Sequence, residues 1–357
     1  MVLGTLAVIV GYPFAIYLIV QLCIIIYDHV IVPHFIEPFP LSRWSSSSSP
    51  WAIVTGGGSG VGRGFAEQLA RRGFNIILLG RSRISMSECQ ESIRSRSPNV
   101  DVVMEEIDFS RPVHEWAQRV EAIISNKDIS ILVNNVGINT EIPVVYSEHD
   151  LAHVQDMIQV NCLAASAMTK IVLPLMKQNG KGGIIFLSSC TGEFASPMMA
   201  VYSGTKAYIR RFGEALSEEV KSSHIDVLVL HPYYVLSKMS GFRKPSLLVC
   251  TPTVFATCAL RYLGRKVVVQ PYFPHLCLDV LFSLVPLGLS LRFQLNRMKT
   301  VAVRLMRRKN REREASLGSG SSAEIEFQRG SSHSSTDIDC EDDDKKALLS
   351  PPALITQ

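Results

Sequence analysis

From Trp51 onward, short apolar runs alternate regularly with amphipathic stretches. The first unit has a strand-like run at residues 51–56, a helix-like stretch at 63–72 that ends at Gly73, and a second strand-like run at 75–80. Further apolar runs follow at residues 101–108, 129–137, 182–189 and 225–232, with helical patterns between them. Strands that alternate with helices are typical of parallel sheets, because each crossover needs room for a helix. The sequence therefore predicts an α/β fold with a doubly wound parallel sheet.

A glycine-rich turn joins the first predicted strand to the first predicted helix. Residues 55–62 read TGGGSGVG. Glycines at this position let the backbone approach a pyrophosphate at the helix N-terminus. Glycines also serve ordinary tight turns, and it is the strand, turn and helix context that favours a Rossmann-like dinucleotide site. The expected cofactor contacts are Gly56, Gly60, Val61 and Gly62.

The end of the second strand indicates which dinucleotide is used. NAD-selective sites normally place an acidic residue there for the ribose hydroxyls, whereas this strand ends with Gly80, Arg81 and Ser82. A guanidinium can pair with a 2′-phosphate, and small neighbours leave room for it. NADPH is therefore the predicted cofactor, with Arg81 as its phosphate ligand; a solvated loop arginine is the alternative.

A tyrosine and a lysine lie four residues apart in a predicted helix, where YSGTK spans residues 202–206. This spacing puts Tyr202 and Lys206 one turn apart on one face. A phenol has a pKa of about 10, and an adjacent ammonium favours its ionised form. At about 4 Å and an effective dielectric near 20, the attraction is about 4 kcal/mol before desolvation. We expect Lys206 to lower the pKa of Tyr202 by a few units; a solvated surface pair is the alternative.

In combination, four motifs resemble the short-chain dehydrogenase/reductase family over residues 51–271. They are TGxxxGxG, NNVG at residues 134–137, a serine in LSS before a glycine-containing loop, and YxxxK. The resemblance implies an NAD(P)(H)-dependent oxidoreductase that interconverts a ketone and a secondary alcohol. It also implies a catalytic set of Asn161, Ser189, Tyr202 and Lys206.

The resemblance gives each of these residues a role. Tyr202 would be the general acid in reduction, and Lys206 would hold the nicotinamide ribose as well as tune the phenol. Ser189, thirteen residues before the tyrosine, would donate a hydrogen bond to the substrate carbonyl, with Ser188 as the adjacent alternative. Asn161 would support a water-linked proton path through the lysine.

The resemblance also assigns residues outside the catalytic set. It implies that Asp108 lies near the adenine, that Asn134 steadies the central strand and that Asn135 contacts the cofactor. The segment after the sixth strand, HPYYVLSKM at residues 231–239, departs from the family's usual Pro-Gly. It is similar to the membrane-bound branch of 17-beta-hydroxysteroid dehydrogenases and very-long-chain 3-oxoacyl-CoA reductases. His231 itself is interpreted as a polar residue at a strand end.

This branch implies NADPH-dependent reduction of a lipid ketone. The expected reaction converts very-long-chain 3-oxoacyl-CoA to 3-hydroxyacyl-CoA in fatty acid elongation. A 17-beta-hydroxysteroid or retinoid dehydrogenase would use the same residues and is the alternative. A non-catalytic membrane scaffold with a dinucleotide-binding fold is an alternative of another class.

The N-terminal segment is free of charge from Met1 to Tyr27 and rich in Val, Ile and Leu. About 20 apolar residues cross a bilayer, so residues 1–32 are predicted to be a transmembrane anchor. A cleaved signal peptide is the alternative, but no Lys or Arg precedes the run and no small-residue cleavage site follows it. Residues 33–50 are rich in proline and serine and are predicted to be a linker.

The C-terminal third changes in character after residue 271. Residues 276–291 are apolar apart from Asp279, and a basic stretch follows. An apolar and then basic pattern predicts that residues 272–313 associate with a membrane surface, with a buried core helix as the alternative. Residues 314–357 combine Ser, Gly and the acidic cluster 342–344, which predicts a disordered tail.

Composition narrows the partners and the compartment. A net charge of +4 is mild and does not indicate nucleic acid. The eight cysteines lack the paired spacing of metal sites or disulfide frameworks, which indicates free thiols. Expected partners are a lipid ketone and a membrane, and a homodimer and other fatty acid elongation enzymes are also considered. We expect the endoplasmic reticulum membrane, with the catalytic domain in the cytosol.

Overall fold

The computed structural model describes residues 2–27, 31–45 and 47–329. The chain divides into two compact units, Met1–Val303 and Arg304–Gln357. The first unit contains the sheet and all the predicted site residues.

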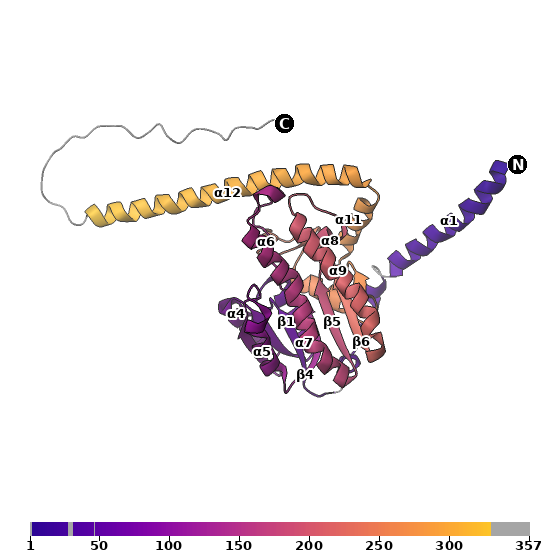
Figure 1. Ribbon diagram of the computed structural model, residues 1–357, viewed down its shortest axis with the longest axis horizontal. Coiled ribbons are helices and arrows are strands. Elements are labelled where there is room, and N and C mark those ends of the chain that lie inside the picture. Colours follow the sequence, from indigo (N-terminus) through magenta and orange to yellow (C-terminus); the bar gives the residue numbers. More distant parts are fainter. Residues whose placement is uncertain (1, 28–30, 46, 330–357) are drawn as a thin grey trace. The chain divides into compact units, whose positions relative to one another are not determined.

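A seven-stranded parallel sheet forms the centre of the first unit (Figure 1). Its order is β3-β2-β1-β4-β5-β6-β9. The strands are β1 (Pro50–Thr55), β2 (Asn75–Gly80), β3 (Val102–Glu106), β4 (Asp128–Asn134), β5 (Gly182–Leu187), β6 (Ile225–Leu230) and β9 (Val268–Val269). The first six match the predicted runs, and the two-residue β9 is too short to leave a periodic pattern. A separate pair joins β7 (Tyr234–Val235) to β8 (Val249–Cys250).

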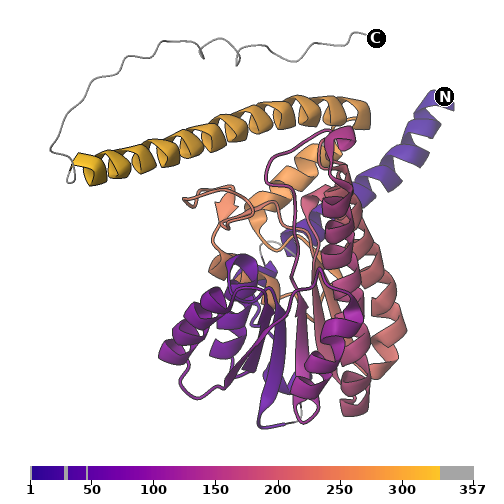
Figure 2. The same ribbon diagram turned by 60° about the vertical axis from the view of Figure 1, so that its left-hand side comes forward.

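Helices cover both faces of the sheet, which confirms the predicted Rossmann-like architecture (Figures 1 and 2). One layer holds α3 (Gly60–Arg71), α4 (Arg83–Arg96) and α10 (Pro252–Leu260), and the other holds α5 (Val113–Ile124), α6 (Leu151–Ile158), α7 (Ala164–Asn179) and α9 (Ala200–Val220). Along β1, Val54 packs into the first core and Ile53 into the second, because neighbouring side chains of a strand point to opposite faces. The strand order reverses between β1 and β4, where open α/β sheets bind ligands.

The segment predicted to be a linker is packed against the domain. It contains α2 (Val32–Phe35) and a short 3₁₀ turn, Leu41–Arg43. Trp44 is 3% exposed and its Nε1 donates to Asp226 Oδ2 at 2.9 Å. Arg43 Nε pairs with the same carboxylate oxygen at 2.6 Å. Lys181 and Arg265 also donate to backbone carbonyls of this stretch, at Ser42 and Glu37. Residues 33–50 thus contact the domain, and their role as a linker stays a prediction.

The N-terminal segment forms one helix, α1 (Val2–Ile26), with Pro13 inside it. Its 25 residues extend about 37 Å, against a hydrocarbon core of about 30 Å. Among the described residues, Leu151–Asn179 is long and apolar enough to span a membrane. This stretch covers the sheet, however, and 44% of its most apolar part is buried. Val10–Ile26 and Phe273–Ser283 are shorter apolar helices. The anchor therefore stays a prediction.

The apolar C-terminal segment is divided between two helices, α11 (Phe273–Ser283) and α12 (Leu287–Arg329). Most of its large apolar side chains are exposed, which differs from the alternative of a buried core helix. Helix α12 continues to Arg329, past residue 314, and the disordered tail stays a prediction. The acidic cluster 342–344 lies outside the described residues.

Candidate active site

The glycine turn between β1 and α3 has a backbone that residues with a side chain rarely adopt. Gly56 and Gly60 have φ of +64° and +52°. A Cβ at Gly62 would stand 2.3 Å from the Gly56 carbonyl oxygen. The first N–H groups of α3 follow directly at Gly60, where a helix start offers unpaired donors to an anion. The turn therefore fits a dinucleotide pyrophosphate.

Thr55 and Asn135 hold this turn in place. Thr55 Oγ1 accepts the Asn135 and Val136 N–H groups at 2.9 and 3.1 Å. Asn135 Nδ2 donates to the Thr55 and Gly56 carbonyls at 2.8 and 3.3 Å. The Asn135 side chain, predicted to contact the cofactor, is thus engaged by the turn. Thr55 was not singled out from the sequence, although a threonine at the strand end beside the glycines was its signal.

Asn134, predicted to steady the central strand, connects that strand to a helix. Its Nδ2 donates to Thr169 Oγ1 on α7 at 3.0 Å, and both residues are buried. Asn134 ends β4 and Asn135 follows it, and the two side chains face different partners. Asn134 links β4 to α7, and Asn135 links it to the turn after β1.

Arg81 and Asp108 line one surface cavity of ≈ 370 Å³ together with Arg111. Ser110 donates to Asp108 Oδ1 from its N–H at 3.0 Å and from its Oγ at 2.8 Å. Desolvation acts to raise the pKa of Asp108, but these bonds and the charges of Arg81 and Arg111 lower it overall. The structure thus brings together the two residues expected at the adenosine end.

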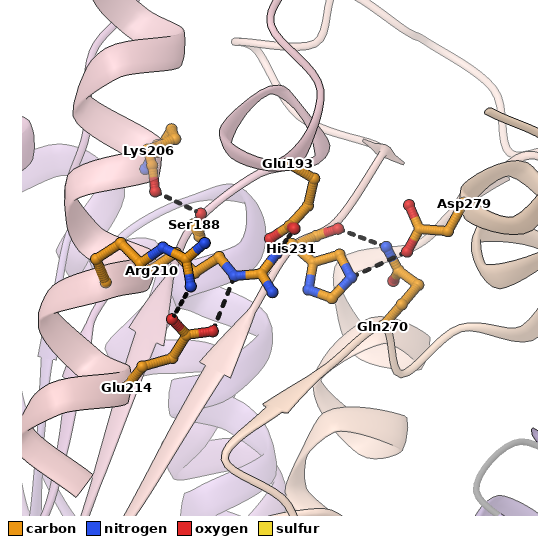
Figure 3. A network of polar contacts seen from close by, with 9 residues as sticks. Ser188, Glu193, Lys206, Arg210, Glu214, His231, Gln270 and Asp279 are labelled. Carbon is orange, nitrogen blue, oxygen red and sulfur yellow. Dashed lines mark hydrogen bonds and ion pairs between the residues drawn. The ribbon is translucent and has the colours of Figure 1, made fainter. Parts of the chain in front are cut away.

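The geometry distinguishes the two adjacent serines. Ser188 is buried, and its Oγ donates to the Lys206 carbonyl at 2.7 Å (Figure 3). Ser189 stands at the start of α8 (Cys190–Glu193), where its Oγ accepts the Thr191 N–H at 3.2 Å. Ser188 is thereby committed to holding α9, whereas the Ser189 hydroxyl donates to Cys190 Sγ at 3.9 Å, a weak acceptor. Ser189 stays the predicted carbonyl ligand, with Ser188 occupied by a different partner.

Tyr202 and Lys206 lie on α9, as predicted, but their electrostatics differ from the expectation. Desolvation raises the pKa of Tyr202 above its usual value, as does the nearby Cys190 thiol, against a hydrogen bond with Ser189. Lys206 Nζ is 5.7 Å from the Tyr202 ring centroid and donates to the Leu187 carbonyl at 2.8 Å. Burial lowers the pKa of Lys206 to about 8. The predicted lowering of the Tyr202 pKa is thus wrong for this geometry, because desolvation outweighs the hydrogen bond with Ser189.

Asn161 lies in a π-helical turn, Gln159–Leu163, between α6 and α7. Its Oδ1 accepts the Ile138 N–H at 2.7 Å, and its Nδ2 donates to the Ile138 carbonyl and to Thr205 Oγ1 at 2.9 and 3.0 Å. A Cβ on Gly137 would meet Asn161 Oδ1 at 3.2 Å and Lys206 Nζ at 3.4 Å. The π turn, a feature common at functional sites, therefore brings Asn161 beside Lys206.

Comparison with known proteins identifies the family. The model of the short chain dehydrogenase family matches residues 50–246, more than half of the chain. The chain belongs to the short-chain dehydrogenase family. It is therefore an NAD(P)-dependent oxidoreductase with a Rossmann-like sheet, as predicted.

Relatives within this family share one name. A very-long-chain 3-oxoacyl-CoA reductase of Mycosarcoma maydis is 34% identical over 69% of this chain and 71% of its own length. The protein of that name in Coprinopsis cinerea is 32% identical over 79% and 86%, and that of Macaca fascicularis is 32% identical over 72% and 82%.

Solved structures share the fold of this family member. A short-chain dehydrogenase from Sphingobium yanoikuyae in complex with NADPH superimposes with a TM-score of 0.57 at 24% identity, covering 66% of this chain and 96% of its own. A 7beta-hydroxysteroid dehydrogenase gives 0.63 at 21% identity, covering 72% and 99%. At such identities the likeness concerns the fold alone.

Proposed function

We propose that this oxidoreductase uses NADPH to reduce very-long-chain 3-oxoacyl-CoA to 3-hydroxyacyl-CoA, the reduction step of fatty acid elongation. The observation that carries this substrate is the identity of 32–34% with reductases of that name over 69–79% of the chain. A 17-beta-hydroxysteroid or retinoid dehydrogenase would use the same residues and is the alternative tested below.

The site residues have the following proposed roles in the reaction. Bound NADPH supplies the hydride to the carbonyl carbon. Ser189 and Tyr202 donate hydrogen bonds to the carbonyl oxygen as negative charge develops on it, and Tyr202 transfers its proton. Lys206 holds the nicotinamide ribose, and Asn161 keeps a water-linked proton path to the lysine.

Exposed apolar and basic residues support a membrane location. Between residues 237 and 303 the chain has nine Lys or Arg residues and one acidic residue, Asp279. Exposed apolar side chains in the same region include Leu247, Phe273, Leu284, Leu287 and Phe293. Apolar groups with cations suit an anionic bilayer surface. We propose that α1 anchors the enzyme in the endoplasmic reticulum membrane, near other elongation enzymes.

The test of the substrate is chain length. The loop after β7 exposes Met239, Phe242, Leu247 and Leu248, which can line a channel for an acyl chain. Each buried methylene contributes about 0.8 kcal/mol, so kcat/KM should rise about fourfold per methylene until the channel is filled. The measurement compares 3-oxoacyl-CoA esters of increasing length with a 17-ketosteroid. A flat response to length with rapid steroid turnover would contradict the proposal.

The cofactor preference is tested at Arg81. Arg81→Ala should weaken NADPH binding by about 1.5 to 3 kcal/mol, roughly 10- to 150-fold, because a charge-assisted bond to the 2′-phosphate is lost. NADH binding should hardly change. Arg83→Ala is the matched control, since Arg83 is an exposed cation two residues away. Equal losses for both cofactors in the Arg81 variant would show that Arg81 is structural.

A further inference from the structure

Helix α11 carries one acidic residue on an otherwise apolar surface. Asp279 lies within Phe273–Ser283, and its side chain is 17% exposed, while Leu281 of the same helix is 58% exposed. Removing a carboxylate from water is unfavourable unless a partner replaces the lost hydration. The partner is His231, whose Nε2 is 2.9 Å from Asp279 Oδ2. A carboxylate accepts, so Nε2 is the donor.

His231 is held at its backbone as well as at its ring. It follows β6 directly and is 8% exposed. Its carbonyl accepts a hydrogen bond from the side-chain amide of Gln270, a residue that follows β9 and is 2% exposed (Figure 3). The ring points toward Asp279 (Figure 3). Two elements distant in sequence therefore converge on the residue after β6.

The residues on either side of His231 hold the segment that carries Ser189. The Ser188 N–H donates to the Leu230 carbonyl at 2.8 Å, and the Cys190 N–H donates to the Pro232 carbonyl at 3.0 Å. Ser189 thus lies between two backbone bonds whose acceptors are the immediate neighbours of His231. A shift of His231 would move both acceptors and, through them, Ser189.

Aromatic contacts connect α11 to the same segment. Phe282 of α11 stacks on Tyr233, with centroids 6.2 Å apart and planes at 15°. The ring centroid of Phe282 also lies 5.9 Å from that of Phe194, which follows α8. The Asp279–His231 hydrogen bond is therefore the polar contact among aromatic ones. Together these contacts join α11 to the segment that follows β6 and to the segment that follows α8.

We propose that Asp279 and His231 are positioning residues that fix the Ser189 segment, with α11 packed on it, for carbonyl reduction. This inference rests on the proposed role of Ser189 and does not depend on which ketone is reduced. The pair acts by holding backbone acceptors in place, without touching the substrate. A small displacement of a hydrogen-bond donor is enough to reduce a rate, because stabilisation of developing charge depends on donor geometry.

The test uses Asp279→Leu, which removes the acceptor and suits the apolar helix, and Asp279→Asn, which keeps an acceptor oxygen. In the full chain we expect Asp279→Leu to lower kcat about tenfold or more, with NADPH affinity within about twofold, and Asp279→Asn to recover most of the rate. The double variant with His231→Leu should be no slower than the slower single variant, because both remove one interaction. Leu281→Ala, on the exposed side of the same helix, is the control and should keep kcat.

Hydrogen exchange supplies a readout that needs no substrate. Amides of residues 184–192 should exchange faster in Asp279→Leu than in the wild type, and should be unchanged in Leu281→Ala. A lower melting temperature with kcat within twofold of wild type and unchanged exchange would overturn the proposal. If the wild type reduces a ketosteroid but no 3-oxoacyl-CoA, the substrate assignment fails, and the same variants still test the pair on the steroid.

Discussion

Replacing Tyr202 by phenylalanine should lower kcat by about 10³-fold, within the usual range for loss of a general acid. The ring and its packing on α9 stay, so only the transferable proton and one hydrogen bond to the carbonyl oxygen are lost. NADPH affinity should stay within about twofold of wild type. Single-turnover reduction of a 3-oxoacyl-CoA, beside a cofactor titration by fluorescence, measures the two effects separately.

The pKa of Tyr202, which desolvation raises, also bears on whether the enzyme is suited to reduction or to oxidation. A phenol that keeps its proton at neutral pH is ready to donate it in reduction, whereas oxidation of the alcohol needs the phenolate. Ser189→Ala, which leaves the phenol in place, is the companion variant and should retain more activity than Tyr202→Phe. A Tyr202→Phe enzyme with most of the wild-type kcat would show that another group is the acid.

Replacing Lys206 by methionine should abolish turnover and yet stabilise the fold near neutral pH. Lys206 is 5% exposed, and burial lowers its pKa to about 8. Between pH 8 and its ordinary value near 10.4, the unfolded chain binds more protons than the folded one. Folding stability of the wild type therefore rises with pH across that window. Below pH 8 the burial of the charged ammonium destabilises the fold by about 3 kcal/mol.

Urea unfolding of wild type and Lys206→Met at pH 7, 9 and 10 checks this difference. The variant should have the larger free energy of unfolding at pH 7, and the difference between the two proteins should shrink as pH rises. Titration of the groups that both proteins share cancels in this difference. NADPH binding should weaken at the same time, because the ribose loses its ligand. Lys206→Arg is the control that keeps a cation. A gap independent of pH would show that the lysine is neutral or well solvated in the folded chain.

Much of the fold was predictable because its signals are local. Strand runs such as residues 75–80 and 182–189 are read from a few neighbouring residues. The first has the bounds of β2, and the second begins with β5 and extends two residues beyond it. The glycine turn followed from its place between a strand and a helix, and the Tyr202 and Lys206 pair from the helical spacing. These features depend on residues near one another in the chain, so the sequence by itself determined them.

Contacts between distant segments were decided only by the tertiary structure. Ser188 and Ser189 are adjacent in the sequence, and only the structure shows that the Ser188 hydroxyl is bound to the carbonyl of Lys206, 18 residues away. The pairing of His231 with Asp279 spans 48 residues. The pKa of Tyr202 depends on how much water the fold removes, and no spacing records this desolvation. Residue patterns thus determined which groups are present, and packing determined which of them meet and how strongly they interact.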